Sequence, residues 1–67
     1  SKNTGAAHVC FIVDDLNAYY DALSAKGYDG WVSAPVHVDA GPSRGGWALY
    51  MLDPDGIRVE LLQPAAA

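Results

Sequence analysis

Two apolar runs joined by a short turn constrain the fold of this chain more than any other feature. The runs are Trp47–Leu52 and residues 57–62, and the turn between them reads DPDG at positions 53–56. The proline presets the backbone for a type I turn, and Gly56 can take the left-handed conformation that follows such a turn. The pattern predicts a β-hairpin with a three-residue loop and a bulge.

This turn also predicts which residues of the hairpin face one another. With Asp53 opposite Ile57, Tyr50 lies opposite Glu60, at about 5 Å across the strands. Because side chains alternate along a strand, Glu60 shares one sheet face with Tyr50, Arg58 and Leu62. The other face carries Leu49, Met51, Val59 and Leu61. A glutamate in the middle of a strand is rarely buried without a partner, so Glu60 is a candidate functional residue.

The first half of the chain predicts a strand followed by a helix. Residues 7–13 (AHVCFIV) are rich in β-favouring side chains. The next two residues, Asp14 and Asp15, suit a helix N-cap and its first turn. A helix over Leu16–Ala25 then carries an apolar stripe at helical spacing and ends before a glycine at the C′ position. The stripe consists of Leu16, Tyr19, Tyr20 and Leu23, and the glycine is Gly27.

Residues 30–39 predict a second strand, in which Pro35 indicates an edge position because proline cannot donate a ladder hydrogen bond. Residues 40–46 form a glycine-rich loop into the hairpin. The order is therefore β-α-β-β-β, which predicts an α+β fold in a single domain.

Composition narrows the classes of partner and compartment. The chain has 67 residues, a net charge of −4 and a single cysteine. The negative charge argues against binding to nucleic acid or to an anionic membrane surface, since both need basic patches. One cysteine excludes an internal disulfide, and no apolar run approaches the roughly 18 residues of a membrane span. A cytoplasmic location is expected.

One amphipathic helix can cover only one face of a four-stranded sheet. The more uniformly apolar face is expected beneath the helix, with Val9, Phe11, Val13, Val59 and Leu61. The other face still carries many apolar side chains around two polar ones, namely His8, Cys10, Ile12, Tyr50, Leu52, Glu60 and Leu62. Such an apolar area is unusual on a monomer. A second layer is expected, from another subunit or from the rest of a longer chain.

Several motifs of this chain closely resemble one module of the vicinal-oxygen-chelate superfamily. They are HVCFIVDDL at 8–16, the glycines and proline of 41–46, and Tyr50 followed by DPDG and the VEL of 59–61. That superfamily includes glyoxalase I, methylmalonyl-CoA epimerase, extradiol dioxygenases, and fosfomycin and bleomycin resistance proteins. The resemblance implies that residues 7–64 form a βαβββ module, one half of a paired-module cupped sheet. By the same resemblance, this is the C-terminal module, residues 1–6 end a linker, and residues 65–67 are a tail.

The resemblance also implies a divalent metal site. The ligands of the superfamily come from the first and last strands of a module, and they fall on His8 and Glu60. An imidazole and a carboxylate suit Fe²⁺, Mn²⁺, Ni²⁺, Co²⁺ or Zn²⁺, but two ligands alone do not hold such an ion firmly. The second module would supply the others. The alternative is that His8 is a core histidine and Glu60 a solvated strand residue.

Four further residues are candidates for contacts with a substrate. Tyr50 is similar in position to a tyrosine that hydrogen-bonds the substrate in extradiol dioxygenases, although a packing role is an alternative. Cys10 is predicted to line the pocket or to act as a small buried hydrophobe. Arg58 is a candidate to meet an anionic substrate, or else an exposed arginine at a strand end. Trp47 is expected to touch substrate near the pocket mouth.

Three classes of function remain open. The first is a metalloenzyme, a glyoxalase I-like lyase or isomerase or an extradiol-type dioxygenase, acting on a small substrate that chelates the metal through vicinal oxygens. In the glyoxalase-like reaction, Glu60 would double as the proton-transfer base. The second is a metal-free dimeric binding protein of the bleomycin-resistance type. The third is a structural or regulatory module without a ligand.

Overall fold

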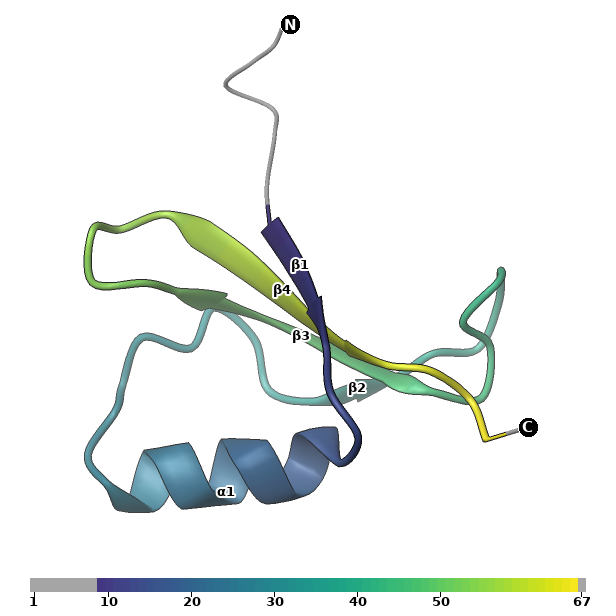
Figure 1. Ribbon diagram of the computed structural model, residues 1–67, viewed down its shortest axis with the longest axis horizontal. Coiled ribbons are helices and arrows are strands. Elements are labelled where there is room, and N and C mark those ends of the chain that lie inside the picture. Colours follow the sequence, from purple (N-terminus) through teal and green to yellow (C-terminus); the bar gives the residue numbers. More distant parts are fainter. Residues whose placement is uncertain (1–8, 67) are drawn as a thin grey trace, which may run out of the picture.

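A computed structural model describes residues 9–66 of the chain. The four strands form one mixed sheet in the order β1-β4-β3-β2, in which β1 runs parallel to β4 and the other neighbours are antiparallel. The helix α1 lies on one face of this sheet (Figure 1). The elements in chain order are β1 (Val9–Ile12), α1 (Leu16–Ala25), β2 (Val36–His37), β3 (Trp47–Leu52) and β4 (Arg58–Gln63). The predicted α+β fold, a single βαβββ module, is confirmed.

The turn between β3 and β4 has the predicted form. The Asp53 N–H donates to the Ile57 carbonyl at 2.9 Å, and the Gly56 N–H donates to the Asp53 carbonyl at 2.9 Å. The Asp53 carboxylate accepts the N–H groups of Asp55 and Ile57, at 2.9 and 2.8 Å. Gly56 has a φ of +81°. Asp53 thus holds both sides of the loop, and this sets the register of the hairpin.

We expect Gly56→Ala to lower the free energy of unfolding by about 1 kcal/mol, because a Cβ is disfavoured at positive φ. A Cβ at Gly56 would meet no atom within 4 Å, so the cost is conformational and not steric. Urea denaturation measures the change. Gly56→Asn is the matched variant, and it should lose less because asparagine tolerates the left-handed region. Equal stability of Gly56→Ala and the wild type would contradict this account of the turn.

The helix begins and ends at the predicted residues, and its start is tied to the sheet. The Asp15 carboxylate accepts the Ala18 N–H at 3.1 Å, which is an N-cap. The side-chain oxygen of Gln63, at the end of β4, accepts the Leu16 N–H at 2.8 Å. Gly27 follows the helix with a φ of +99°. Over residues 9–66, no helix is long and apolar enough to cross a membrane.

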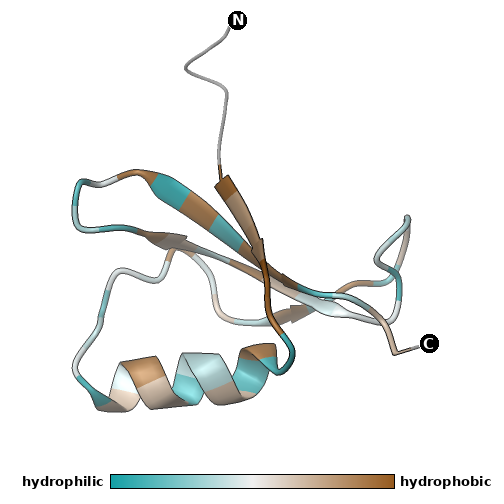
Figure 2. Ribbon diagram, in the orientation of Figure 1, coloured by the Kyte–Doolittle hydropathy of each residue, from teal (hydrophilic) through white to brown (hydrophobic). Residues whose placement is uncertain are grey.

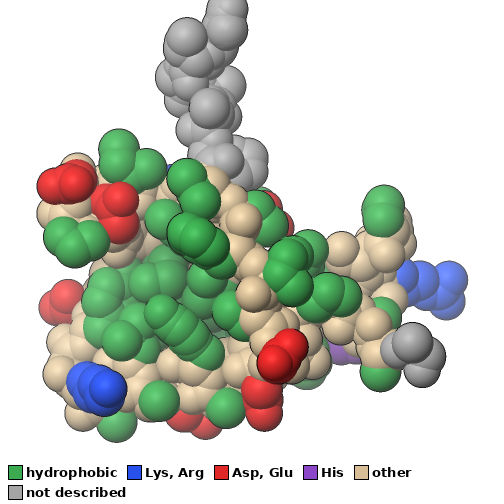
Figure 3. All heavy atoms as spheres, viewed as in Figure 1, with side chains coloured by type: hydrophobic (Ala, Val, Ile, Leu, Met, Phe, Trp, Pro, Cys, Tyr) green, Lys and Arg blue, Asp and Glu red, His purple; other side chains and the backbone are tan. Residues whose placement is uncertain are grey.

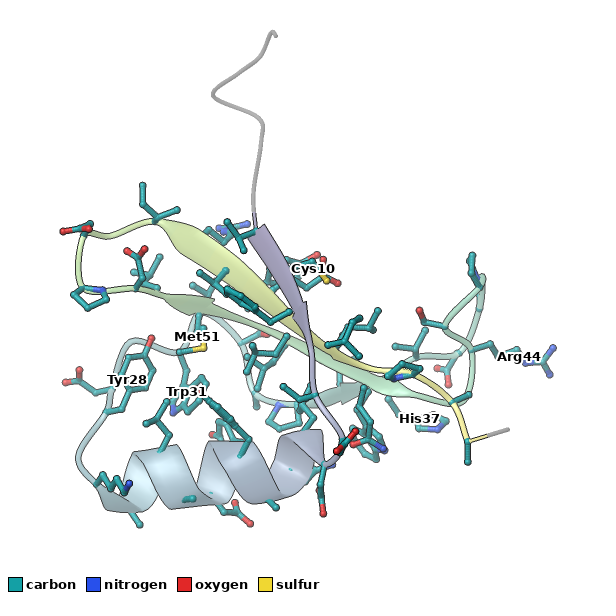
Figure 4. All side chains as sticks on the ribbon, in the orientation of Figure 1. Cys10, Tyr28, Trp31, His37, Arg44 and Met51 are labelled. Carbon is teal, nitrogen blue, oxygen red and sulfur yellow. The ribbon has the colours of Figure 1, made fainter. Side chains whose placement is uncertain are left out.

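The core lies between α1 and strands β3 and β4. Its buried members are Leu16, Leu49, Val59 and Leu61, and the partly buried residues around them are Val13, Tyr20, Trp31, Trp47 and Met51. The Trp31 ring lies 4.7 Å from the rings of both Tyr20 and Tyr28, and its Nε1–H donates to the Ser24 hydroxyl at 2.9 Å. Tyr28, Trp31 and Met51 lie between the helix and the sheet in Figure 4. Trp31, which follows the helix, therefore closes one end of the core.

The second strand is much shorter than expected. Residues 30–39 were predicted to be extended throughout, but only Val36–His37 form β2, with a separate bridge from Trp31 to Met51. The Ser33 hydroxyl accepts the Tyr50 N–H at 3.1 Å, in place of a backbone carbonyl. Pro35 has no N–H to donate. The ladder is interrupted at these residues, although the predicted edge position of β2 is confirmed.

The helix covers less of its sheet face than expected. Val9 and Phe11 of β1 stay 45% and 54% exposed, and Tyr19 of the expected apolar stripe stays 38% exposed. A helix about 10 Å wide spans about two strands spaced about 4.8 Å apart, so it cannot reach across all four. Figure 3 shows apolar side chains gathered at the solvent surface between α1 and β1. The helix lies on the predicted face, over Val59 and Leu61, but it leaves Val9 and Phe11 of that face exposed.

Candidate functional site

The sheet face opposite α1, here called the open face, is not covered by any helix formed by residues 9–66. Its exposed apolar residues are Ile12 at 62%, Val36 at 56% and Leu52 at 37%. The strand β4 alternates between hydrophilic and hydrophobic residues in Figure 2, as expected for a strand with two different faces. Its polar residues Arg58 and Glu60 lie on the open face, while Val59 and Leu61 lie in the core.

Glu60 occupies the centre of the open face. In the ladder it is paired with Cys10 of β1 on one side and with Tyr50 of β3 on the other. Glu60 and Tyr50 are both half-buried, whereas Cys10 is exposed. The hairpin register predicted from the turn is thus correct. A carboxylate, a phenol and a thiol from three neighbouring strands are brought to one place.

The surroundings of Cys10 change the pKa of its thiol. The loss of surrounding water raises the pKa of Cys10, and the nearby negative charge of Glu60 raises it further. The thiol is therefore protonated at neutral pH, and it is a weaker nucleophile than an ordinary cysteine. Figure 4 shows Cys10 on the side of the sheet away from α1. Cys10 is therefore an exposed residue of the open face, and not a small buried hydrophobe.

Arg58 leans over a ring on the neighbouring strand. Its guanidinium carbon lies 5.6 Å from the centre of the Tyr50 ring, within the range of a cation–π interaction. In the ladder Arg58 faces Leu52, so Tyr50 is its diagonal neighbour. Diagonal neighbours lie within reach of long and aromatic side chains. The sequence analysis did not predict this contact, although the predicted register already makes Tyr50 the diagonal neighbour of Arg58.

Trp47 does not lie with the other candidates. It occupies the same sheet face as Leu49 and packs around the core, on the side of α1. Its ring meets the exposed His37 ring edge-on, with 5.1 Å between centroids, and the His37 Nδ1 lies 3.2 Å from an Asp39 carboxylate oxygen. Trp47 is therefore separated from Tyr50 and Glu60 by the sheet itself.

The chemistry of the donors on the open face suits a divalent metal only in part. A carboxylate oxygen is a metal ligand, and a cysteine sulfur becomes one only when the thiol loses its proton; a firmly held ion needs about four donors. Within residues 9–66, no three His, Cys, Asp or Glu side chains cluster closely enough to hold an ion. His8, predicted as a ligand, lies outside the described residues. Of the two predicted ligands, Glu60 is the one whose position the structure describes. An ion bound at Glu60 would need further donors from outside residues 9–66.

Comparison with known proteins identifies the family. The family model described as Glyoxalase/Bleomycin resistance protein/Dioxygenase superfamily matches residues 1–61. A probable lactoylglutathione lyase of Vibrio parahaemolyticus serotype O3:K6 is 37% identical over 62 residues, which are 90% of this chain and 41% of that relative. The chain therefore spans about two fifths of that relative's length. No solved structure matches the chain.

The family match agrees with the single βαβββ module described above. The resemblance seen in the sequence motifs is thereby confirmed. This chain belongs to the Glyoxalase/Bleomycin resistance protein/Dioxygenase superfamily.

Proposed function

We propose that this chain is one module of a metal-dependent, glyoxalase I-like lyase or isomerase that acts on a small substrate with two neighbouring oxygens. The observation that carries the proposal is Glu60, half-buried at the centre of the open face between Cys10 and Tyr50. Family membership supports it, as does similarity to a protein named as a probable lactoylglutathione lyase.

Each polar group on the open face has a role in this proposal. Glu60 and His8 hold a divalent metal together with ligands from a second module. When bound, the metal supplies a Lewis acid that makes the carbon-bound proton of a chelated substrate more acidic. The Glu60 carboxylate takes that proton from one carbon and returns it to the neighbouring carbon, as a general base and then a general acid. Tyr50 donates a hydrogen bond to a substrate oxygen.

The proposal requires a second layer over the open face. Ile12, Val36 and Leu52 are large apolar side chains exposed on that face, and soluble monomers rarely leave such patches uncovered. A second βαβββ module would cover them and complete the shell of ligands, either from the same polypeptide or from a homodimer partner. The small substrate would then bind between the two modules.

One observation favours a second candidate, an extradiol-type dioxygenase. Tyr50 lies directly opposite Glu60, where its hydroxyl could hydrogen-bond a metal-chelating catechol. In either reaction His8 and Glu60 would be the metal ligands from this module, but the dioxygenase would also need molecular oxygen and a redox-active ion such as Fe²⁺ or Mn²⁺. The two can be separated with the complete, metal-loaded protein, which would either isomerise a hemithioacetal or consume oxygen with a catechol.

We expect the complete protein to bind about one divalent metal per pair of modules, and the variant His8→Ala to lose most of it. A metal site that loses one of about four ligands binds its ion much more weakly. Elemental analysis after dialysis measures the metal content. His37→Ala is the matched control, because His37 is exposed and its ring contacts Trp47 on the other side of the sheet. A wild-type protein that takes up no metal would contradict the proposal and favour a metal-free binding protein of the bleomycin-resistance type.

A further inference from the structure

Arg58 is an exposed, positively charged group on the open face, and its guanidinium lies over the Tyr50 ring. Its guanidinium carbon lies 5.6 Å from the centre of the Tyr50 ring, and Tyr50 stands on the next strand. An arginine on a strand surface normally samples many rotamers, and stacking on an aromatic ring restricts them. Arg58 is two residues before Glu60 on β4, so the two side chains emerge about 7 Å apart on one face.

The hydrogen-bonding capacity of Arg58 is not taken up by acidic side chains of the described chain. Guanidinium carries five N–H donors in a planar fork. Within residues 9–66 the ion pair found is that of His37 with Asp39, and no described carboxylate lies within 4 Å of the Arg58 nitrogens. The ring of Tyr50 meets the guanidinium without accepting its N–H groups in a fork. The planar edge of Arg58 is thus available to an oxyanion, beside the proposed metal ligand Glu60.

We propose that Arg58, positioned by Tyr50, binds a carboxylate of the substrate, so that the substrate class is a small chelating molecule with an anionic group beyond its two neighbouring oxygens. This inference rests on the proposed function, because the chelating end is assigned to the metal. A carboxylate matches the guanidinium fork through two parallel hydrogen bonds. A doubly charged phosphate fits less well, since one cation stands there next to the negative charge of Glu60.

A matched pair of ligands tests the proposal without requiring turnover. The compounds 2-hydroxyglutarate and 2-hydroxypentanoate each have five carbons and a 2-hydroxy acid that can chelate a metal. They differ only at the far end, which is a carboxylate in the first and a methyl group in the second. Binding of each to the complete, metal-loaded protein is measured by isothermal titration calorimetry. We expect 2-hydroxyglutarate to bind about tenfold more tightly, the usual effect of one charge-assisted contact.

Variants at Arg58 then assign the preference to this side chain. Arg58→Met removes the charge and keeps much of the side-chain volume, and it should reduce the tenfold preference to about unity by weakening the binding of 2-hydroxyglutarate. Arg44→Met is the control for net charge, because Arg44 is exposed in the loop at 40–46 and points away from the sheet (Figure 4). It should retain the full preference, since distant surface charges are screened by salt.

Variants of Tyr50 test whether its ring positions the Arg58 guanidinium, because they leave the charge of Arg58 in place. Tyr50→Leu removes the ring beneath Arg58 and should lower the preference several-fold, whereas Tyr50→Phe keeps the ring and should retain it. A wild-type protein that binds both compounds equally well would overturn the role of Arg58 and leave the metal site standing. If neither compound binds to the metal-loaded protein, the chelating site itself is wrong, and the inference about Arg58 falls with it.

Discussion

Replacing Glu60 with glutamine should lower the turnover of the complete, metal-loaded enzyme by about a thousandfold, within the usual range for loss of a general base. Glutamine has nearly the same shape as glutamate and keeps one oxygen that can face a metal, but it cannot accept a proton from carbon. Methylglyoxal and glutathione provide the assay, because they combine to a hemithioacetal that is an isomer of lactoylglutathione. Isomerisation moves one proton between the adjacent carbons and one between the oxygens that those carbons carry, and the product is followed by its absorbance.

Two variants make this result specific to the carboxylate. Asp21→Asn removes the same charge from the exposed surface of α1 and should leave turnover within about twofold of the wild type. Glu60→Ala should lose metal as well as turnover, since it removes the ligand oxygen altogether. If Glu60→Gln keeps both its metal and full turnover, then Glu60 is not the base. The half-buried position between Cys10 and Tyr50 would then be a matter of packing.

The hairpin was predictable because its determinants are local. Asp53 accepts two backbone N–H groups of its own turn, and Gly56 supplies the one positive φ that the turn needs. These contacts span at most four residues, so the sequence contains all of the information. The register follows from the turn, and the pairing of Tyr50 with Glu60 follows from the register. The helix was predictable for a similar reason, since Asp15 and Gly27 mark its two ends.

Most of the features that were missed depend on tertiary contacts, and not on the turn signals or periodic patterns from which the elements were predicted. The strand at 30–39 is broken because the Ser33 hydroxyl bonds the backbone of Tyr50, seventeen residues away. Trp31 enters the core through Ser24 and the rings of Tyr20 and Tyr28, which no periodic pattern reveals. Trp47 was expected at the pocket mouth, but strand parity puts it on the core side with Leu49. The sequence already contained the information for Trp47, because the alternation of side chains along the predicted strand puts Trp47 and Leu49 on one face.

Gly46 is a further residue whose role comes from the tertiary structure. It is buried where β3 begins, and the end of the chain passes directly over it. A Cβ placed on Gly46 would overlap the Gln63 carbonyl oxygen and would approach the backbone of Pro64 and Ala65 at 3.0 Å. These are backbone atoms, which cannot turn aside as a flexible side chain can. The same Gln63 holds the first N–H of α1 through its side chain, so displacement of β4 at this point also disturbs the helix.

We therefore expect Gly46→Ala to lower the free energy of unfolding by about 3 kcal/mol or more, at the upper end of the cost of overpacking a core. Chemical denaturation of the complete protein measures the loss. Gly56→Ala is the matched comparison, because it adds the same methyl group where nothing lies within 4 Å, and its cost of about 1 kcal/mol comes from the backbone conformation alone. Gly46 does not have a positive φ, so its cost must come from the crowding. If the two variants lose the same amount, the chain end does not press on Gly46. The packing of Gly46 of the loop against Gln63 of β4, which also bonds the start of α1, would then be less tight than described.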